Sequence, residues 1–253
     1  DQLFDDLNKK IVGRRITDVW SDWQKTVKKP SFKNFRKLIK NKKIIKVGRR
    51  AKNILVYLSE NYLLLIHLKM TGHLLVGEWR IEKSKVQSRK SKDLVIPIEP
   101  KEVVEDPYNK YIHLIFYLDP ARSRSPRGGR SHSLKARAAS NGVDNGQMLG
   151  FSDLRKFGKM ILGTREQING LSEIKKLGPE PLDKSLKSIK FIKSEKRKIK
   201  QVLMDQEVIA GIGNIYSDEI LWEAKISPLK PANKLSEKEL QELWKAIHKI
   251  LVK

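Results

Sequence analysis

A glycine-containing segment between two predicted helices has the residue types that bind phosphate. Residues 205–216 read DQEVIAGIGNIY, and Asn214 is predicted to cap the helix that follows the two glycines. Backbone N–H groups at such a helix start, together with the positive end of the helix dipole, favour an anion. The residues before the segment supply five cations: Lys193, Lys196, Arg197, Lys198 and Lys200. This combination predicts that the segment clamps a nucleic-acid backbone.

The overall charge of the chain also predicts a polyanionic partner. The 253 residues contain 53 Lys and Arg against 29 Asp and Glu, a formal charge of +24. An excess of this size destabilises a compact fold by self-repulsion, so a nucleic-acid partner is the natural explanation. No run of 18 or more apolar residues is present, which excludes a membrane-spanning helix. The absence of cysteine excludes disulfides and thiolate zinc sites within this sequence, and the five histidines lack metal-ligand spacing, which disfavours a metallohydrolase.

Short apolar runs separated by turn residues predict an antiparallel β-sandwich or barrel in the first part of the chain. A short helix is expected ahead of them, because apolar residues share one face before Gly13. These helix residues are Leu3, Phe4, Leu7 and Ile11. The predicted strands lie at 44–47, 54–58, 63–68, 112–118 and 148–151, and turn sequences such as SEN at 59–61 separate them.

After Gly163 the pattern becomes helical and predicts a second, all-α domain. The chain is expected to be helical from Leu182 onward, and the SEKE sequence at 236–239 is a capping box that begins an amphipathic helix. The apolar positions of that helix are Leu240, Leu243, Trp244, Ile247, Ile250 and Leu251. The predicted fold class is therefore α+β. It has a β-sandwich catalytic-type domain over 1–165, a linker over 166–189 and a helical DNA-binding domain over 190–253.

Two stretches interrupt this pattern. Residues 80–106 are charged and contain prolines, and they are predicted to form a long loop. Residues 120–144 form a low-complexity segment with six basic residues and one acid, which predicts a disordered basic insertion. Either a passenger without a role or a DNA-binding arm fits that composition. Removing it would leave a charge of 24 − 5 = +19, so the nucleic-acid prediction does not depend on it.

Several motifs resemble those of the formamidopyrimidine-DNA glycosylases, a family of bifunctional DNA glycosylase/AP lyases, and they occur in the family's order. Residues 196–230 resemble the family's helix–two-turns–helix segment. Upstream, GRRAK at 48–52, HLKMTG at 67–72, DLRKFG at 153–158 and LGPEPL at 177–182 each resemble a family motif. The resemblance covers nearly the whole chain except the two interruptions. It implies an enzyme of base-excision repair that flips a damaged base out of duplex DNA.

The resemblance also implies roles for individual residues. Lys52 would donate a proton during elimination at the abasic sugar. Met70, Arg155 and Phe157 resemble the three residues that fill the gap left by the extruded nucleotide. Flipping a base costs a few kcal/mol of stacking and pairing, which inserted side chains partly replace. Three residues resemble the phosphate-contacting positions of the family's helical domain: Lys196, Lys200 and Asn214.

The same motifs imply a preference for oxidised purines. The related endonuclease VIII group prefers oxidised pyrimidines and generally lacks the Arg-x-Phe-Gly arrangement that Arg155 to Gly158 form here. One departure concerns the family's His-x-His pair, whose first histidine touches DNA. Tyr111 and His113 stand at those positions, so Tyr111 is the predicted DNA contact.

The ends of the sequence also depart from the family pattern. The family begins with Pro-Glu, whose proline amine is the nucleophile, whereas this sequence opens at Asp1, within the helix expected to follow. It stops at Lys253, before the lesion-recognition loop and the four-cysteine zinc finger. We therefore expect a chain that is truncated at both ends, inactive as given and without a cofactor. We expect it to be a monomer that binds damaged double-stranded DNA and no membrane, in the bacterial cytoplasm at the nucleoid.

Two other functions remain open from the sequence. A noncatalytic damaged-DNA-binding paralogue is the main alternative, because the nucleophile is not visible. A ribosomal or RNA-binding protein would account for the charge, but it would not account for several motifs in one order.

Overall fold

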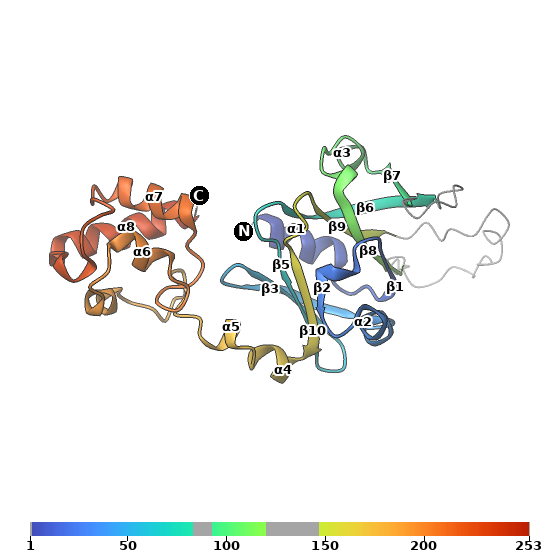
Figure 1. The fold of residues 1–253 in the computed structure, drawn as a ribbon, viewed down its shortest axis with the longest axis horizontal. Coiled ribbons are helices and arrows are strands. Elements are labelled where there is room, and N and C mark those ends of the chain that lie inside the picture. Colours follow the sequence, from blue (N-terminus) through green and yellow to red (C-terminus); the bar gives the residue numbers. More distant parts are fainter. Residues whose placement is uncertain (1, 83–92, 120–146, 253) are drawn as a thin grey trace, which may run out of the picture. The chain divides into compact units, whose positions relative to one another are not determined.

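The computed structural model describes residues 2–82, 93–119 and 147–252, which group into two compact units (Figure 1). The β unit comprises Gln2–Gly48 and Leu55–Arg165, and the helical unit comprises Arg49–Ile54 and Glu166–Lys253. The predicted basic insertion at 120–144 lies outside the described residues. The domain limits expected from the sequence, 1–165, 166–189 and 190–253, stay a prediction.

Two five-stranded sheets build the β unit. In the first, the order is β1 (Ile16–Ser21), β8 (Ile112–Leu118), β9 (Met148–Asp153), β6 (Gly72–Glu82) and β7 (Leu94–Glu99). In the second, the order is β2 (Val27–Lys29), β10 (Lys159–Thr164), β5 (Tyr62–His67), β4 (Asn53–Leu58) and β3 (Ile44–Arg50). The β2–β10 pair is parallel, whereas β10–β5 and the four pairs of the first sheet are antiparallel. The predicted fold class is thus confirmed, and all five predicted strands are present.

The first helix, α1 (Gln2–Ile11), packs as the sequence predicted. Leu7 and Ile11 are buried, and Gly13 follows with a φ of 90°, a left-handed conformation that glycine adopts without strain. Asn8 fixes α1 to β3, because its side chain accepts from the Val47 N–H and donates to the Val47 carbonyl, each at 3.0 Å. A second helix, α2 (Phe32–Ile39), was not predicted; it buries Phe35 and Ile39.

The prediction of a long loop over residues 80–106 is wrong for its described part, and residues 83–92 lie outside the described residues. Strand β6 continues to Glu82, β7 pairs with it, and α3 (Lys101–Val104) follows. Trp79 of β6 anchors this region, because its buried indole N–H donates to Asn109 Oδ1 at 2.8 Å in the short 3-10 helix η2 (Asn109–Tyr111). The same tryptophan packs against Val103, so its burial stabilises the segment that the charged composition had suggested was a loop.

The helical unit is built around a core of buried aliphatic residues. Its elements are α4 (Arg165–Asn169), α5 (Ser172–Lys175), η3 (Lys190–Ser194), α6 (Ile199–Met204), α7 (Asn214–Glu223), η4 (Ala232–Lys234) and α8 (Glu237–Val252). The predicted capping box is confirmed: the Ser236 N–H donates to Glu239 Oε2 at 2.8 Å, and the Glu239 N–H donates to Ser236 Oγ at 3.2 Å. The prediction of helix from Leu182 onward is wrong for residues 182–189, and helical turns resume only at η3.

Replacing Trp79 with phenylalanine should destabilise the β unit. The substitution leaves Asn109 Oδ1 buried without its donor and removes packing volume, and together these should lower the free energy of unfolding by about 2–4 kcal/mol. Urea denaturation followed by circular dichroism measures this change. Trp222→Phe is the matched control, because Trp222 is 87% exposed and its variant should stay within about 0.5 kcal/mol of the parent. Equal stability of the two variants would contradict the anchoring role of Trp79.

Candidate nucleic-acid interface

Two turns of the β unit lie side by side, and each joins one sheet to the other. Residues 68–71 connect β5 to β6, and residues 154–158 connect β9 to β10. They are neighbours because Gly72 pairs with Asp153 in one sheet and His67 pairs with Lys159 in the other. This register brings the HLKMTG and DLRKFG motifs together, although more than eighty residues of sequence separate them.

The carboxylate of Asp153 holds the two turns in place. It is 1% exposed, and it accepts hydrogen bonds from Thr71 Oγ1 at 2.5 Å, the Arg155 N–H at 3.2 Å and the Gly158 N–H at 2.7 Å. A buried carboxylate needs such donors, because burial of a charge without partners is costly. One side chain therefore fixes the backbone of its own turn and the side chain of the neighbouring turn.

Both turns also require close backbone approaches at a glycine. A Cβ atom at Gly72 would lie 2.3 Å from the Leu68 carbonyl oxygen, and one at Gly158 would lie 2.4 Å from the Phe151 ring. Lys69 and Lys156 adopt left-handed backbone conformations at φ 59° and 58°. Such residues persist only where the surroundings fix the conformation, which agrees with turns built to hold their side chains rigidly.

The tips of the two turns expose large side chains. Met70 is 74% exposed and Phe157 is 60% exposed, so neither of them packs into the core. The Arg155 guanidinium meets Met70 at 3.4 Å between Nη1 and Sδ. The structure thus brings Met70 and Arg155 into contact and places Phe157 on the same turn as Arg155.

Two residues that sequence reasoning missed support these turns. Trp23, which follows β1, lies under the Lys156 ammonium with 4.4 Å from Nζ to the ring centroid. His67 Nδ1 accepts the Lys69 N–H at 3.0 Å, so the ring proton of a neutral His67 sits on Nε2, which is then a donor. His67 lies inside the HLKMTG motif and could have been found there. No sequence signal connects Trp23 to Lys156.

Tyr111 is half-buried in η2, directly before β8. Since Ile112 pairs with Ser152, Tyr111 lies at the same strand ends as the two turns, and the Lys110 ammonium lies 5.1 Å from its ring centroid. His113 instead points inward: it is buried, and its Nδ1 meets Asp22 Oδ1 at 2.8 Å. Of this pair, only Tyr111 is partly exposed, and its contact with DNA stays a prediction.

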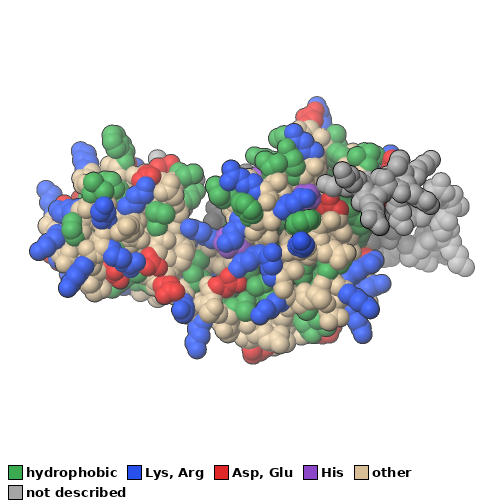
Figure 2. All heavy atoms as spheres, viewed as in Figure 1, with side chains coloured by type: hydrophobic (Ala, Val, Ile, Leu, Met, Phe, Trp, Pro, Cys, Tyr) green, Lys and Arg blue, Asp and Glu red, His purple; other side chains and the backbone are tan. Residues whose placement is uncertain are grey.

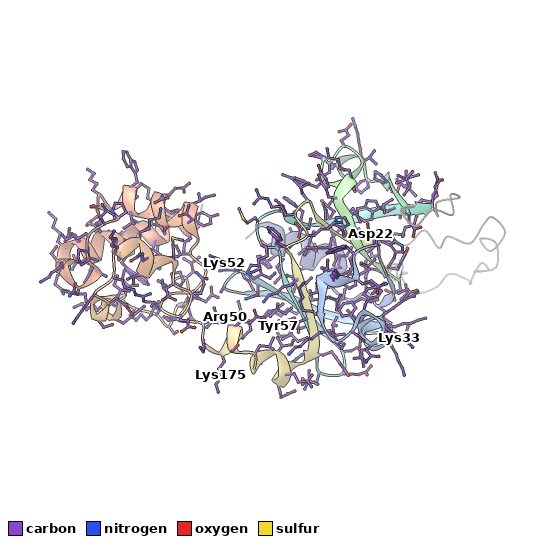
Figure 3. All side chains as sticks on the ribbon, in the orientation of Figure 1. Asp22, Lys33, Arg50, Lys52, Tyr57 and Lys175 are labelled. Carbon is purple, nitrogen blue, oxygen red and sulfur yellow. The ribbon has the colours of Figure 1, made fainter. Side chains whose placement is uncertain are left out.

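In the helical unit, Glu180 holds the segment that carries Lys52. Glu180 Oε1 accepts the Ala51 N–H, and its two carboxylate oxygens lie 3.4 Å from the guanidinium groups of Arg50 and Arg49. Arg50 also donates to the carbonyls of Leu177 and Gly178 at 3.0 Å. The GRRAK and LGPEPL motifs are therefore two halves of one arrangement. Figure 3 shows Arg50 and Lys52 where β3 leads into β4.

The ammonium of Lys52 lies close to the start of α7. A Cβ atom at Gly213 would lie 3.5 Å from Lys52 Nζ, an ordinary van der Waals contact, so the ammonium lies directly beside this residue. The prediction that Asn214 caps α7 is wrong: Gly213 is the N-cap, and Asn214 is the first, exposed residue of the helix. Gln206 closes the preceding loop, since it accepts the Gly211 N–H at 2.9 Å and donates to the Ile212 carbonyl at 2.8 Å.

The other predicted cations of the helical unit differ in their engagement. Lys196 is exposed between η3 and α6. Lys200 lies on α6 and pairs with Asp218 of α7 at 2.7 Å, so part of its charge is already compensated. Arg197 bonds Glu195 and Asp205 at 2.8 and 2.7 Å and holds the pKa of Asp205 below its usual value. On the face drawn in Figure 2, Lys and Arg side chains are spread over both units.

Within residues 2–82, 93–119 and 147–252, no group of three or more His, Asp or Glu residues is arranged to hold a metal ion. The expectation of no cofactor stays a prediction. In the same part of the chain, no helix has the length and apolar character needed to cross a membrane.

Comparison with known proteins gives concordant results over both units. Residues 2–160 match the family model of the formamidopyrimidine-DNA glycosylase N-terminal domain, and residues 177–253 match that of the formamidopyrimidine-DNA glycosylase H2TH domain. A formamidopyrimidine-DNA glycosylase of Pelotomaculum thermopropionicum is 34% identical over 249 residues, covering 97% of this chain and 72% of the relative.

Solved structures of a Lactococcus lactis protein are also similar. Its complex with DNA containing Fapy-dG matches with a TM-score of 0.70, covering 99% of this chain and 76% of that one. Its complex with DNA containing an abasic site matches with a TM-score of 0.72, covering 99% and 75%. The sequence identity is 26% in both cases.

Replacing Asp153 with asparagine should loosen both turns at once. The amide would direct an NH₂ group at donors that now face a carboxylate oxygen, which should cost about 2–3 kcal/mol of stability. Amide hydrogen exchange at Arg155 and Gly158 should speed up in parallel. Asp183→Asn is the control, because the Asp183 carboxylate is exposed and accepts its hydrogen bonds from Ser185, two residues along the chain. If exchange at Arg155 and Gly158 stays as slow in the Asp153 variant as in the parent, Asp153 does not hold the turns.

Proposed function

The chain belongs to the formamidopyrimidine-DNA glycosylase family, and from this premise we propose that it removes oxidised purines from duplex DNA after flipping the damaged nucleotide out of the helix. Members of this family are DNA glycosylases of base-excision repair that act on damaged duplex DNA. The observation that carries the proposal is the exposure of Met70, Arg155 and Phe157 on two turns that Asp153 fixes.

The three exposed side chains fit the gap that a flipped nucleotide leaves. Met70 and Phe157 offer apolar surface that can stack on the neighbouring base pairs, and Arg155 offers donors to the partner base. Flipping costs a few kcal/mol, and contacts that form only after extrusion offset part of this cost. Because the turns are already rigid, little conformational entropy is lost when the side chains enter the DNA.

The start of α7 and the Lys52 ammonium form the proposed phosphate clamp. Backbone N–H groups of the first helical turn and the dipole of α7 favour a phosphate at Gly213 and Asn214. Lys52 lies beside Gly213, so the ammonium and the helix start can contact the same sugar–phosphate unit. We assign Lys52 the role of proton donor during elimination at the abasic sugar, with Lys196 and Lys200 as further phosphate contacts.

The preference for oxidised purines follows from the Arg155-Lys156-Phe157-Gly158 sequence, which the resemblance associates with purine lesions. The test uses the protein expressed from its complete reading frame, with duplexes that carry a formamidopyrimidine, 8-oxoguanine or thymine glycol. Release of the two purine lesions ahead of thymine glycol supports the proposal, and preferential release of thymine glycol contradicts it. Tight lesion binding without base release would identify a noncatalytic damaged-DNA-binding paralogue. We place this activity at the chromosomal DNA of a bacterial cytoplasm.

Substituting Arg155 or Phe157 with alanine should impair extrusion more than general DNA binding. A fluorescent base analogue at the lesion position reports extrusion by stopped-flow, and we expect its rate to fall at least tenfold, because these side chains act only once the base has left the stack. Affinity for undamaged duplex should change less than threefold.

Leu154→Ala is the matched control for this experiment, because Leu154 is 51% exposed and lies on the same turn. Its variant should extrude the base at the parental rate. Slow extrusion by the Leu154 variant as well would show that the turn, and not the two proposed side chains, limits the step.

Replacing Glu180 with glutamine should displace the segment that positions Lys52. The neutral side chain no longer attracts Arg49 and Arg50, so we expect elimination at a preformed abasic site to slow by about tenfold or more. Glu207→Gln provides the control, because Glu207 is exposed and lies 3.8 Å from Lys176. An unchanged elimination rate in the Glu180 variant would show that elimination does not depend on the position of Lys52 that Glu180 fixes.

A further inference from the structure

A strongly basic surface lies on the β unit around α2. Residues 23–48 contain ten Lys and Arg residues and no Asp or Glu. None of the functions assigned above uses these cations. Mutual repulsion among them opposes folding, so a surface of this kind indicates a polyanionic partner.

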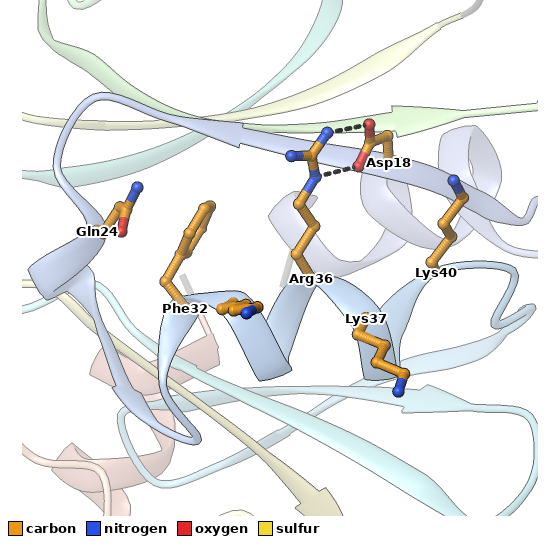
Figure 4. A pocket seen from close by; sticks show the side chains of 7 residues that line it. Asp18, Gln24, Phe32, Arg36, Lys37 and Lys40 are labelled. Carbon is orange, nitrogen blue, oxygen red and sulfur yellow. Dashed lines mark hydrogen bonds and ion pairs between the residues drawn. The ribbon is translucent and has the colours of Figure 1, made fainter.

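The centre of this surface is a cavity of about 390 Å³ between α2 and β1. Lys33, Arg36, Lys37 and Lys40 all come from α2 or its C-cap, and their spacing of three and four residues places them on one helix face. Figure 4 shows the cavity with Asp18 of β1 opposite Arg36. Among the residues that the structure describes, Asp18 is the sole acidic one in its lining.

The acidic residue is already engaged. Arg36 donates two hydrogen bonds to the Asp18 carboxylate, at 2.6 Å from Nε and 2.5 Å from Nη2 (Figure 4). This pairing holds the pKa of Asp18 below its usual value, so the pair stays neutral as a whole. Within the described residues, no ion pair engages Lys33, Lys37 or Lys40. The cavity therefore holds three ammonium groups without an ion-pair partner among the described residues, although the charge of Lys40 also helps to lower the pKa of Asp18.

The spacing of these lysines matches a nucleic-acid strand. From Lys33 to Lys40 the helix advances about 10 Å at 1.5 Å per residue. A DNA strand carries one phosphate per 3.4 Å of helix axis, so the lysines can neutralise about two or three phosphates. Lysines act as flexible point charges that suit phosphates without reading bases. Protein–protein interfaces, in contrast, are depleted in lysine.

The lysines of α2 are separate from the two turns that carry Met70 and Arg155, although Trp23, at the start of the basic segment, contacts Lys156 of the second turn. Strand β10 begins directly after the second turn, and β2 runs parallel to it, with Val27 opposite Met160 and Lys29 opposite Ile161. The chain then enters α2, so α2 lies towards the far end of β10, away from the turns (Figure 1). DNA bound at the turns therefore leaves the lysines of α2 available.

We propose that Lys33, Lys37 and Lys40 form a second DNA-binding surface, which holds the backbone of a duplex segment other than the one that contains the lesion. This surface is independent of base flipping. It lets the protein contact two duplex segments together, and it would promote transfer between segments during the search for damage.

The test is a two-duplex capture experiment. The protein is immobilised on a short abasic duplex that spans only the lesion site, and a fluorescent undamaged duplex is then added over a series of salt concentrations. The triple variant K33Q/K37Q/K40Q should capture the second duplex at least tenfold more weakly than the parent. Its slope of log K against log salt should be shallower by about two, since each phosphate contact contributes about 0.9.

The control triple variant is K101Q/K238Q/K245Q, which removes the same charge from exposed positions elsewhere. It should capture the second duplex as the parent does. Equal capture by the α2 variant and the parent overturns the proposal. A second result also overturns the proposal: the same three lysines retain polyglutamate in place of the duplex. This result would identify an acidic protein as the partner.

A further measurement separates this proposal from the proposed function. Affinity for the short abasic duplex and base extrusion should be unchanged in K33Q/K37Q/K40Q, and the melting temperature should stay close to the parent's. Loss of lesion binding in this variant would show that the lysines serve the lesion site itself, which contradicts a separate surface. Failure of lesion binding in the parent would instead count against the proposed function alone.

Discussion

Side chains that replace a base in the DNA stack must be exposed and rigid at the same time, and a buried carboxylate reconciles these demands. Exposed residues such as Met70 and Phe157 receive little support from packing. Their positions depend on the backbone of two turns, and that backbone depends on Asp153. Because the Asp153 carboxylate is buried, its hydrogen bonds are strong and the loss of any donor is costly. The hydrogen bonds of the buried Asp153 carboxylate thus keep the two surface turns rigid.

In the helical unit a carboxylate also holds a segment of the chain, but its partners are mainly cations. Glu180 faces two arginines and one backbone N–H, and it holds the segment that carries Lys52. Charge neutralisation by Arg49 and Arg50 makes this carboxylate easier to bury than Asp153, which is held mostly by neutral donors. The cations have a second consequence: they raise the positive potential around Lys52 and Gly213, where a phosphate is proposed to bind.

How far the sequence predicts this structure depends on where the partners of a residue lie. The strands at 54–58 and 63–68 were predictable because continuous apolar runs reveal buried strands. Helix α2 was missed because its cations concealed the spacing of Phe32, Phe35 and Ile39, and β7 because Pro97 and charged flanks resemble a loop. The motifs identified the turns that carry Met70 and Arg155. They could not identify Trp23, since its contact with Lys156 joins residues more than a hundred positions apart.

Arginine and lysine side chains have different roles in this protein. Arg36, Arg49, Arg50 and Arg197 face carboxylates within the fold, as suits a planar group with several fixed donors. Lysines supply most of the exposed charge, including Lys196 and the α2 surface. Lysine contacts to phosphate are screened by salt and do not depend on sequence. Under the proposed roles, attraction to DNA and recognition of damage rest on different residues, so a change in the lysines should alter the search for a lesion without altering how the lesion is recognised.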